Sequence, residues 1–276
     1  MASVELPVRG RLERELEELV EDNRFTIAVV FPVVGAVALL ASAEALLPGP
    51  LNFNPYLLLF GVAVMRLPLV AGLAPLLSRR AVAGLLALCG YTYAVEFVGV
   101  LTGYPYGSFE YGVDLGPMLG GAVPAALPLF FIPLVVNAYL LCLLLSDRVA
   151  HSSAVRLPSV VLAVIGMDLV LDPAAVSLGF WTYDAGGAYY GVPWLNYLGW
   201  TLSATVAVAL FDTALDRNAV LRRLEGCGFM LDDLVSFVLL WGAVNAYFGN
   251  WIAATLAVGY GYGLWRVDRF DFPERY

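Results

Sequence analysis

The chain has 276 residues, of which 61% are hydrophobic and only 14% charged, and its formal net charge is −8. A soluble domain averages about 45–50% apolar and roughly 25% charged residues, so this composition favours a membrane protein. The acidic excess argues against nucleic acid and against anionic lipid as specific partners. All 15 basic residues are arginine, and the chain contains no lysine. An acidic, lysine-free composition resembles that of proteins from salt-loving archaea.

Apolar runs long enough to cross a bilayer recur along the chain, which predicts an all-α, polytopic helical membrane protein. A charged segment, residues 1–24, precedes them and is predicted to form a solvated acidic helix. The runs cover residues 25–47, 55–77, 81–101, 122–145, 157–177, 195–214, 230–247 and 250–266. The last two are short, so we expect about eight transmembrane helices and leave seven open. Residues 25–267 then form one transmembrane domain, followed by a tail at 268–276.

Arginine placement predicts the orientation of these helices. Every arginine except Arg66 lies before the first run or in the segments that follow the second, fourth, sixth and last runs. The loops at 48–54, 102–121, 178–194 and 248–249 contain none. Cytoplasmic loops of membrane proteins carry the excess of positive charge. We therefore expect a multi-pass protein of the cell membrane with both termini in the cytoplasm and the arginine-free loops outside.

Two of the outer loops have a similar character. The loops at 102–121 and 179–200 are rich in glycine and aromatic residues, and each follows an acid-bearing run and precedes a Val-Pro pair. Glycine and proline break the helix at these points, and tyrosine and tryptophan favour the membrane interface. The pattern indicates a weak internal repeat.

Ionisable residues inside the apolar runs are the clearest functional signal, because each costs about 2.5–3.5 kcal/mol on insertion scales. Asp168 and Asp172 are four residues apart and share one helix face. Glu96 and Asp172 are expected at similar depth near the outer side, where no arginine is predicted. An Arg66–Asp168 ion pair is the structural alternative for the two charges that lie deeper.

A carboxyl in apolar surroundings favours its neutral form and can therefore carry a transferable proton. Aromatic ring faces stabilise a neighbouring cation. An acid, a cation shelter and interfacial water are together what hydration of a lipid double bond requires. The candidate ring residues beside the acids are Tyr91, Tyr93, Tyr104, Tyr106, Trp181, Tyr183 and Trp200.

Several other functions are excluded because the chain lacks the residues that they require. A retinal protein needs a Schiff-base lysine, and His151 alone supplies neither haem or di-metal ligands nor a Ser-His-Asp triad. Three cysteines lack metal-site spacing, so no metal is expected. An intramembrane prenyltransferase would use two aspartate pairs. The pairs Asp168/Asp172 and Asp212/Asp216 fall towards opposite ends of their helices and are not expected to share a metal cluster.

Two ordered motifs connect these residues to a known family. The first is an acidic residue followed by G-x-x-T-G-x-P-aromatic-G-x-aromatic-x-Y, met by Glu96, Gly99, Thr102, Gly103, Pro105, Tyr106, Gly107, Phe109 and Tyr111. The second is D-x-x-x-D-P, then W-x-aromatic and G-x-Y-aromatic-G-V-P-x-x-N-aromatic-x-G-W. Its positions are met by Asp168, Asp172, Pro173, Trp181, Tyr183, Gly187, Tyr189, Tyr190, Gly191, Val192, Pro193, Asn196, Tyr197, Gly199 and Trp200. Over residues 80–215 the chain resembles the carotenoid hydratase family of membrane proteins.

The resemblance implies addition of water, without a cofactor, to the terminal double bonds of an acyclic carotenoid. For a haloarchaeal chain the implied reaction is bisanhydrobacterioruberin to bacterioruberin. Glu96 or Asp172 is then the general acid, the other orients water, and Asp168 supports them. The implied substrate-binding residues are Tyr93, Tyr104, Tyr106, Trp181, Tyr183, Asn196 and Trp200. Carotenoid, water and membrane lipid are the expected partners.

Two other readings of the sequence stay open. The weak repeat and the intramembrane charges are compatible with a transporter, and the aromatic loops with a carotenoid-binding scaffold. Both motif loops lie on one predicted side, whereas alternating access uses gates on both sides. A scaffold would need the rings but not three acids. The intramembrane prenyltransferase is the second alternative.

Overall fold

Long apolar runs become long helices because the bilayer core offers no water to pair with backbone N–H and C=O groups. The computed structural model describes residues 8–270, so the outermost parts of the predicted N-terminal segment and tail lie outside the described residues. Within that range seven helical stretches are long and apolar enough to span a membrane: Thr26–Ala43, Pro55–Leu76, Arg79–Thr102, Leu127–Leu145, Ser153–Ser177, Trp194–Ala214 and Gly228–Phe248. The predicted polytopic all-α fold is confirmed.

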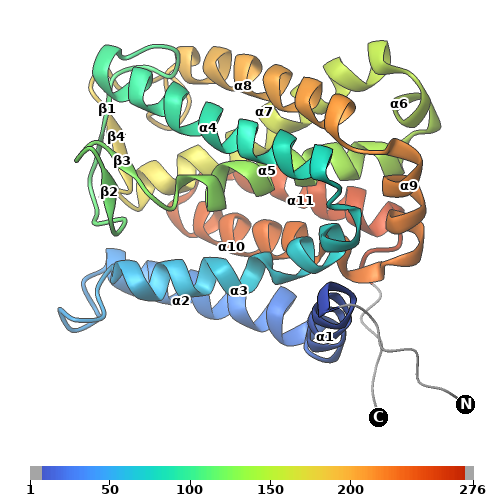
Figure 1. Ribbon diagram of the computed structural model, residues 1–276. Coiled ribbons are helices and arrows are strands. Elements are labelled where there is room, and N and C mark those ends of the chain that lie inside the picture. The colour runs from blue at the N-terminus through green and yellow to red at the C-terminus, as the bar shows by residue number, and fades with distance from the viewer. Residues whose placement is uncertain (1–7, 271–276) are drawn as a thin grey trace, which may run out of the picture.

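These stretches contain the main helices of the bundle (Figure 1). They are α2 (Phe31–Ala43) after the π-helical η1 (Thr26–Val30), α3 (Pro55–Leu73) followed by η2 (Ala74–Leu76), α4 (Arg79–Thr102), α5 (Leu127–Leu145), α7 (Ser153–Ser177), α8 (Trp194–Ala214), and η3 (Gly228–Leu231) leading into α10 (Asp232–Phe248). Burial is highest in α5 and in the η3–α10 stretch, where 67% and 72% of the residues are buried. The other helices pack around these two.

The last predicted span forms a shorter helix, α11 (Trp251–Arg266). Its 16 residues rise about 24 Å, less than the roughly 30 Å hydrocarbon core. It turns back from α10 at Gly249, whose positive φ of 76° suits glycine, and packs against α10 and α7. Seven helices therefore reach spanning length among the described residues, and α11 is an eighth helix within the bundle.

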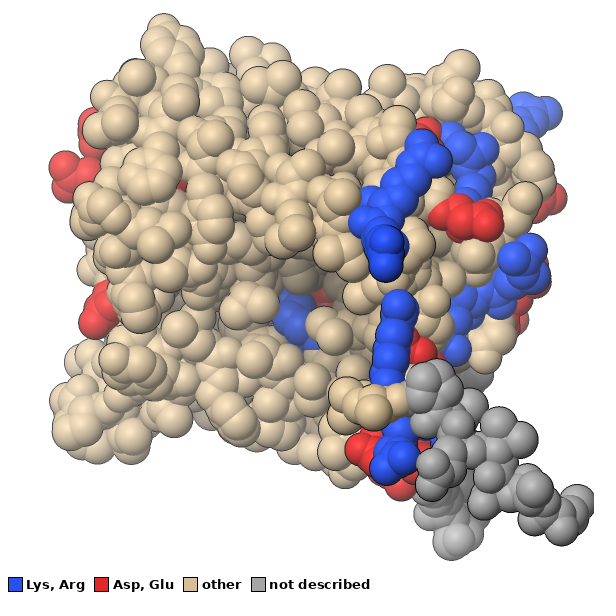
Figure 2. Space-filling model, in the orientation of Figure 1, with Lys and Arg blue, Asp and Glu red and all other residues tan. Residues whose placement is uncertain are grey.

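The two ends of the bundle differ in structure and charge. Short helices α1 (Val8–Asp22), α6 (Asp147–His151) and α9 (Arg217–Gly226) lie at one end, and the strands lie at the other (Figure 1). Most of the basic side chains visible on the face in Figure 2 gather at the end of the short helices. The loops that carry arginine in the sequence thus lie together at one end of the bundle.

The aromatic-glycine loops are joined to each other by hydrogen bonds. Strand β1 (Phe109–Tyr111) of the first loop pairs antiparallel with β4 (Trp181–Tyr183) of the second. A second ribbon, β2 (Met118–Leu119) with β3 (Val123–Pro124), lies within the first loop. The β1–β4 ribbon ties the C-terminal end of α4 to that of α7, the two helices that carry the predicted acids.

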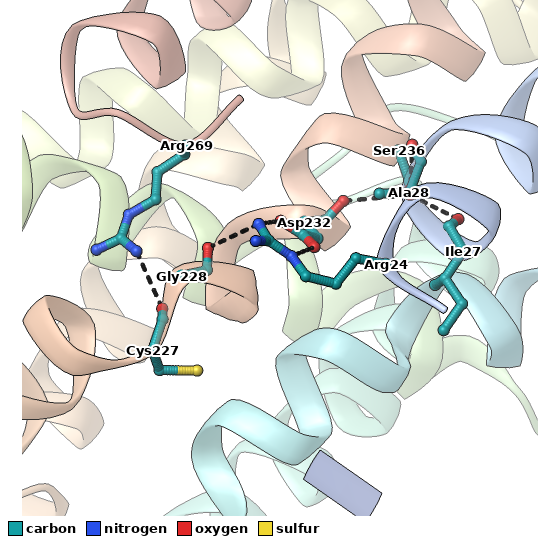
Figure 3. Close-up of polar contacts among 8 residues, drawn as sticks. All are labelled: Arg24, Ile27, Ala28, Cys227, Gly228, Asp232, Ser236 and Arg269. Atoms are coloured by element: carbon teal, nitrogen blue, oxygen red, sulfur yellow. Dashed lines mark hydrogen bonds and ion pairs between the residues drawn. The ribbon is translucent and has the colours of Figure 1, made fainter. Parts of the chain in front are cut away.

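Buried arginines at the opposite end of the bundle are all engaged. Figure 3 shows Arg24 and Arg269 reaching the turn that precedes α10 from opposite ends of the chain. Arg24 holds Asp232 at 2.8 Å and donates to the Gly228 carbonyl at 3.2 Å, while Arg269 donates to the Cys227 carbonyl at 3.0 Å. These contacts fasten both chain ends to the start of α10.

The predicted partner of Arg66 is wrong. Arg66 forms its ion pair with Asp233 at the start of α10, and Asn137 of α5 donates to the same carboxylate at 2.5 Å. Arg66 also donates to the Leu129 carbonyl at 3.2 Å. Asp168 is bound elsewhere. Hydropathy predicts how deep in the membrane a residue lies. It does not predict which neighbouring helix its side chain faces.

Removing the carboxylate of Asp212 is expected to destabilise the fold. Arg156 is fully buried and holds Asp212 at 2.5 Å, and Tyr139 donates to the same carboxylate at 2.8 Å. Asp212→Ala leaves this guanidinium without its counter-charge, which costs about 3–5 kcal/mol. Thermal unfolding in detergent should show a lower midpoint for Asp212→Ala, whereas the exposed Asp147→Ala should unfold as the unmodified protein does. Equal midpoints for the two variants would contradict this role.

Candidate active site

A cavity of about 400 Å³ opens among the helices near the strand-bearing end. Its wall is mostly apolar and includes residues of α2, α3, α5 and α10. Its carboxyl groups come from α4 and α7, an amide comes from α8, and tyrosine hydroxyls come from the β1–β4 ribbon. This volume lies within the range of about 300–1,000 Å³ typical of ligand sites. In Figure 2 the surface is hollowed between α3 and the helices above it, α4 and α5.

Glu96 of α4 and Asp172 of α7 both line this cavity. The two predicted acids are therefore brought into one chamber by separate helices. Among the described residues no arginine lies within ion-pair distance of Glu96, Asp168 or Asp172. The carboxyls instead accept hydrogen bonds from the neutral side chains of Tyr111, Tyr183 and Asn196.

Glu96 and Asp172 each accept a hydrogen bond from a tyrosine hydroxyl of the β1–β4 ribbon. Tyr111 donates a short hydrogen bond to Glu96 Oε1, and Tyr183 donates to Asp172 Oδ2 at 3.0 Å. Burial, followed by the neighbouring carboxylate, raises the pKa of both tyrosines far above the ordinary value. Both hydroxyls therefore keep their protons and act as hydrogen-bond donors.

Strand alternation explains why the tyrosines point inward. Phe109 is paired with Tyr183, and Tyr111 with Trp181, so four rings share one face of the ribbon. All four line the cavity. The residues between them, Glu110 and Thr182, are exposed. The ribbon thus closes the chamber with aromatic rings and delivers one hydroxyl to each acid.

Asn196 of α8 connects the two aspartates. Its amide nitrogen donates to Asp168 Oδ2 at 2.7 Å and to Asp172 Oδ2 at 2.6 Å. Asn196 lines the cavity, and both of these hydrogen bonds use its amide nitrogen rather than its amide oxygen. Asp168 is fully buried and outside the cavity lining, and its Oδ1 has no partner among the described residues. Asp168 is thus buried beside the chamber and is joined to the lining by its hydrogen bond from Asn196.

Aromatic rings form the wall beside the acids. Trp200 stacks on Phe131 with ring centroids 4.9 Å apart, and Tyr106 lies 6.1 Å from Trp200. The Tyr106 hydroxyl is fixed by the Ser203 hydroxyl at 2.6 Å. Of the predicted substrate-binding residues, Tyr106, Trp181, Tyr183, Asn196 and Trp200 line the cavity. Electron-rich ring faces here are suited to shelter a cation.

Two predicted substrate-binding residues lie outside the lining. Tyr104 is 66% exposed at the end of α4, and Tyr93 donates its hydroxyl to the Ala125 carbonyl at 2.6 Å. Tyr93 lies in the acid-bearing run and Tyr104 in the loop that follows it, but neither residue lines the cavity. Arg66 likewise stays at its ion pair with Asp233.

Sequence reasoning missed the role of Tyr111 and the far wall of the chamber. Tyr111 appeared in the first motif without a function, although its spacing of two from Phe109 is the signal of one strand face. The far wall consists of apolar residues of α2, α3 and α10, among them Leu58 and Trp241. Nothing in their composition distinguishes them from lipid-facing residues.

The sequence of this chain matches known proteins over most of its length. A model of the carotenoid biosynthesis protein family matches residues 53–264. The chain is 61% identical over 258 residues, 94% of its own length and 88% of the relative's, to a bisanhydrobacterioruberin hydratase of Haloarcula japonica. No solved structure matches. The family match spans the acids, the ribbon and the cavity wall from α3 to α10, and on these grounds the chain belongs to the carotenoid biosynthesis protein family.

Proposed function

We propose that this protein hydrates the terminal double bonds of bisanhydrobacterioruberin and so produces bacterioruberin. The proposal combines the similarity to the Haloarcula japonica hydratase with the chamber, where two carboxyls from different helices face one apolar, ring-walled space. That pairing of acids is the observation that carries it. An acid and a base on either side of a double bond are what addition of water needs.

The reaction begins with proton transfer from Glu96. Its carboxyl proton adds to the less substituted carbon of the terminal double bond, and the other carbon becomes a tertiary cation. Glu96 accepts one described side-chain hydrogen bond, whereas Asp172 Oδ2 accepts two, from Tyr183 and Asn196. Because donors stabilise the charged form of a carboxyl, Asp172 suits the base and Glu96 the acid.

Water then captures the cation. The faces of Trp181, Trp200 and Tyr106 shelter the positive carbon. Asp172 takes a proton from the attacking water, and the amide oxygen of Asn196 accepts a second hydrogen bond from it. The product is a tertiary alcohol. Proton return from Asp172 to Glu96 through cavity water restores the starting state, and no electrons are gained or lost.

The direct test is product mass. Cells that make bisanhydrobacterioruberin and express this chain should yield carotenoids heavier by one water for each reacted end. Unchanged carotenoid mass, with the protein present in the membrane fraction, would contradict the proposal. Lycopene-producing cells run in parallel separate a C50-specific enzyme from one that accepts C40 chains.

The proposed location is the cell membrane, with both termini in the cytoplasm. The arginine-bearing end of the bundle would face inward and the β1–β4 ribbon outward. The acids then lie near the outer interface, where water is at hand. A reporter fused to either terminus should be active only in the cytoplasm.

A transporter or carotenoid-binding scaffold remains the alternative from another class. Deleting a hydratase leaves the anhydro carotenoid in the cell, whereas deleting a transporter or scaffold changes pigment amount or location but not its hydroxyl count. The prenyltransferase alternative gains no support. Asp212 is paired with Arg156, and Asp216 accepts hydrogen bonds from the first turn of α9.

Tyr111→Phe is expected to slow hydration by about 10–100-fold. The change keeps the ring but removes one hydrogen bond to Glu96, and a bond to a charged group is worth roughly 1.5–3 kcal/mol. Rates measured from carotenoid mass should fall while protein yield stays constant. Tyr104→Phe, at an exposed ring outside the chamber, is the matched control and should leave the rate unchanged. Equal rates for the two variants would remove Tyr111 from the mechanism.

A further inference from the structure

One face of α2 lines the cavity along most of the helix. Its lining residues are Phe31, Gly35, Ala38, Leu39 and Ser42. Their spacing of three and four residues is that of a single helix face. From Phe31 to Ser42 the helix rises about 16 Å. The cavity is therefore elongated along the bundle axis rather than confined to the acids.

The facing side of α3 and part of α10 complete this extension. Leu58, Gly61, Val62 and Met65 line it from α3, and Leu240 and Trp241 line it from α10. We call this set of α2, α3 and α10 residues the α2–α3 groove. Apart from Ser42, each of its side chains is apolar or, for Trp241, mostly apolar. The groove offers a surface for hydrocarbon and almost no hydrogen bonding.

The groove extends from the acids towards the arginine-bearing end. Glu96 lies six residues before the end of α4 and Asp172 five before the end of α7, both near the strand-bearing end. Ser42 lies next to the end of α2 on the same side, whereas Phe31 begins α2. A ligand with its tip between the acids would thus run along α2 towards Phe31.

The groove is open to the surroundings of the bundle along α3. Leu57, near the strand-bearing start of α3, lines the cavity and is still 53% exposed, and the lining residues Gly61 and Val62 further along α3 are half-buried. A chain longer than the groove therefore has an exit into the lipid. A closed pocket of this volume would hold only a small molecule, but an open one accepts the end of a long one.

We infer that the α2–α3 groove binds the polyene chain of the substrate along the bundle axis, with the reacting end between Glu96 and Asp172 and the remainder in the lipid. The inference rests on the proposed function, since it takes the ligand to be a long carotenoid. It assigns α2, α3 and α10 to substrate binding and leaves the chemistry to α4, α7 and α8.

Gly61 provides the test. A Cβ atom added at Gly61 meets no atom within 4 Å, and Gly61 lines the cavity, so Gly61→Phe is expected to fill groove space, and glycine is the weaker helix former. Gly90 on α4 also has no atom within 4 Å, is exposed and lies outside the cavity. Gly90→Phe is therefore the matched control. Gly61→Leu, a smaller change, serves if Gly61→Phe does not accumulate.

Two readouts are taken on the purified full chain. Quenching of tryptophan fluorescence on titration with bisanhydrobacterioruberin in micelles reports binding, because Trp181, Trp200 and Trp241 line the cavity. Carotenoid mass reports hydration. We expect Gly61→Phe to lose at least tenfold in affinity and nearly all hydration. Gly90→Phe should match the unmodified protein, and Glu96→Gln should bind normally without hydrating.

Failure of the groove and failure of the proposed function give different results. A Gly61 variant that binds and hydrates like the unmodified protein overturns the groove and leaves the hydratase intact. An unmodified protein that binds the carotenoid but never hydrates it overturns the function, and loss of binding in Gly61→Phe then still supports the groove. An unmodified protein that does not bind the carotenoid overturns the inference.

Discussion

Asp172→Asn is expected to lower the rate of hydration by about 10²–10⁴-fold, the range that a general base contributes. Asparagine keeps the shape of the side chain but cannot take a proton from the attacking water. Asp172 lines the cavity and accepts from Tyr183 and Asn196, so the neighbouring groups have a partner of similar size in the variant. The measurement is the mass of carotenoids formed per unit of membrane-inserted protein.

Glu110→Gln is the matched control for this prediction. Glu110 lies on β1 between two chamber-lining rings, but its own side chain is exposed on the opposite face of the ribbon. It tests whether loss of any carboxylate at this end of the bundle impairs the protein. Full activity in Asp172→Asn, or an equal loss in Glu110→Gln, would end the assignment of Asp172 as base.

Glu96→Gln is expected to reduce hydration by a similar factor of about 10²–10⁴, for a different reason. The amide has no acidic proton, so the double bond is never protonated and no cation forms. Its size matches glutamic acid, and Tyr111 can still donate to the amide oxygen. Near-normal rates in this variant would require another proton source and exclude Glu96 as the acid.

Deuterium oxide separates the two roles. In Asp172→Asn, Glu96 can still protonate the alkene reversibly, so unhydrated substrate should gain deuterium at its end group. In Glu96→Gln the same substrate should gain none. Mass spectrometry of the recovered carotenoid reads both results. The reverse pattern would mean that Asp172 is the acid and Glu96 the base.

Much of this protein could be predicted from local sequence signals. Hydropathy located the spanning helices, and acids within apolar runs stood out because they are costly there. Glu96 and Asp172 were placed at similar depth, and the structure puts both on one cavity. The motif spacing identified the family, which the comparisons confirm.

Contacts between distant segments could not be predicted in the same way. β1 and β4 are three residues each and about 70 residues apart in sequence, too short to stand out by alternation. Arg66 was paired with Asp168 by depth, but Asp233, at the start of the last long span, faces it instead. The cavity wall formed by α2 and α3 carried no signal in the sequence, because an apolar groove and the lipid favour the same side chains.

The pairing of β1 with β4 limits how the lengths of the two aromatic-glycine loops can change. Neighbouring residues of a strand point to opposite sides, so a shift of the pairing by one position would turn Tyr111 or Tyr183 outward and bring Glu110 or Thr182 inward. A shift by two positions would again point the tyrosine side chains into the cavity. Insertion of a single residue in either strand should therefore abolish activity more often than insertion of two residues. Natural variants of these strands should accordingly differ in length by even numbers of residues.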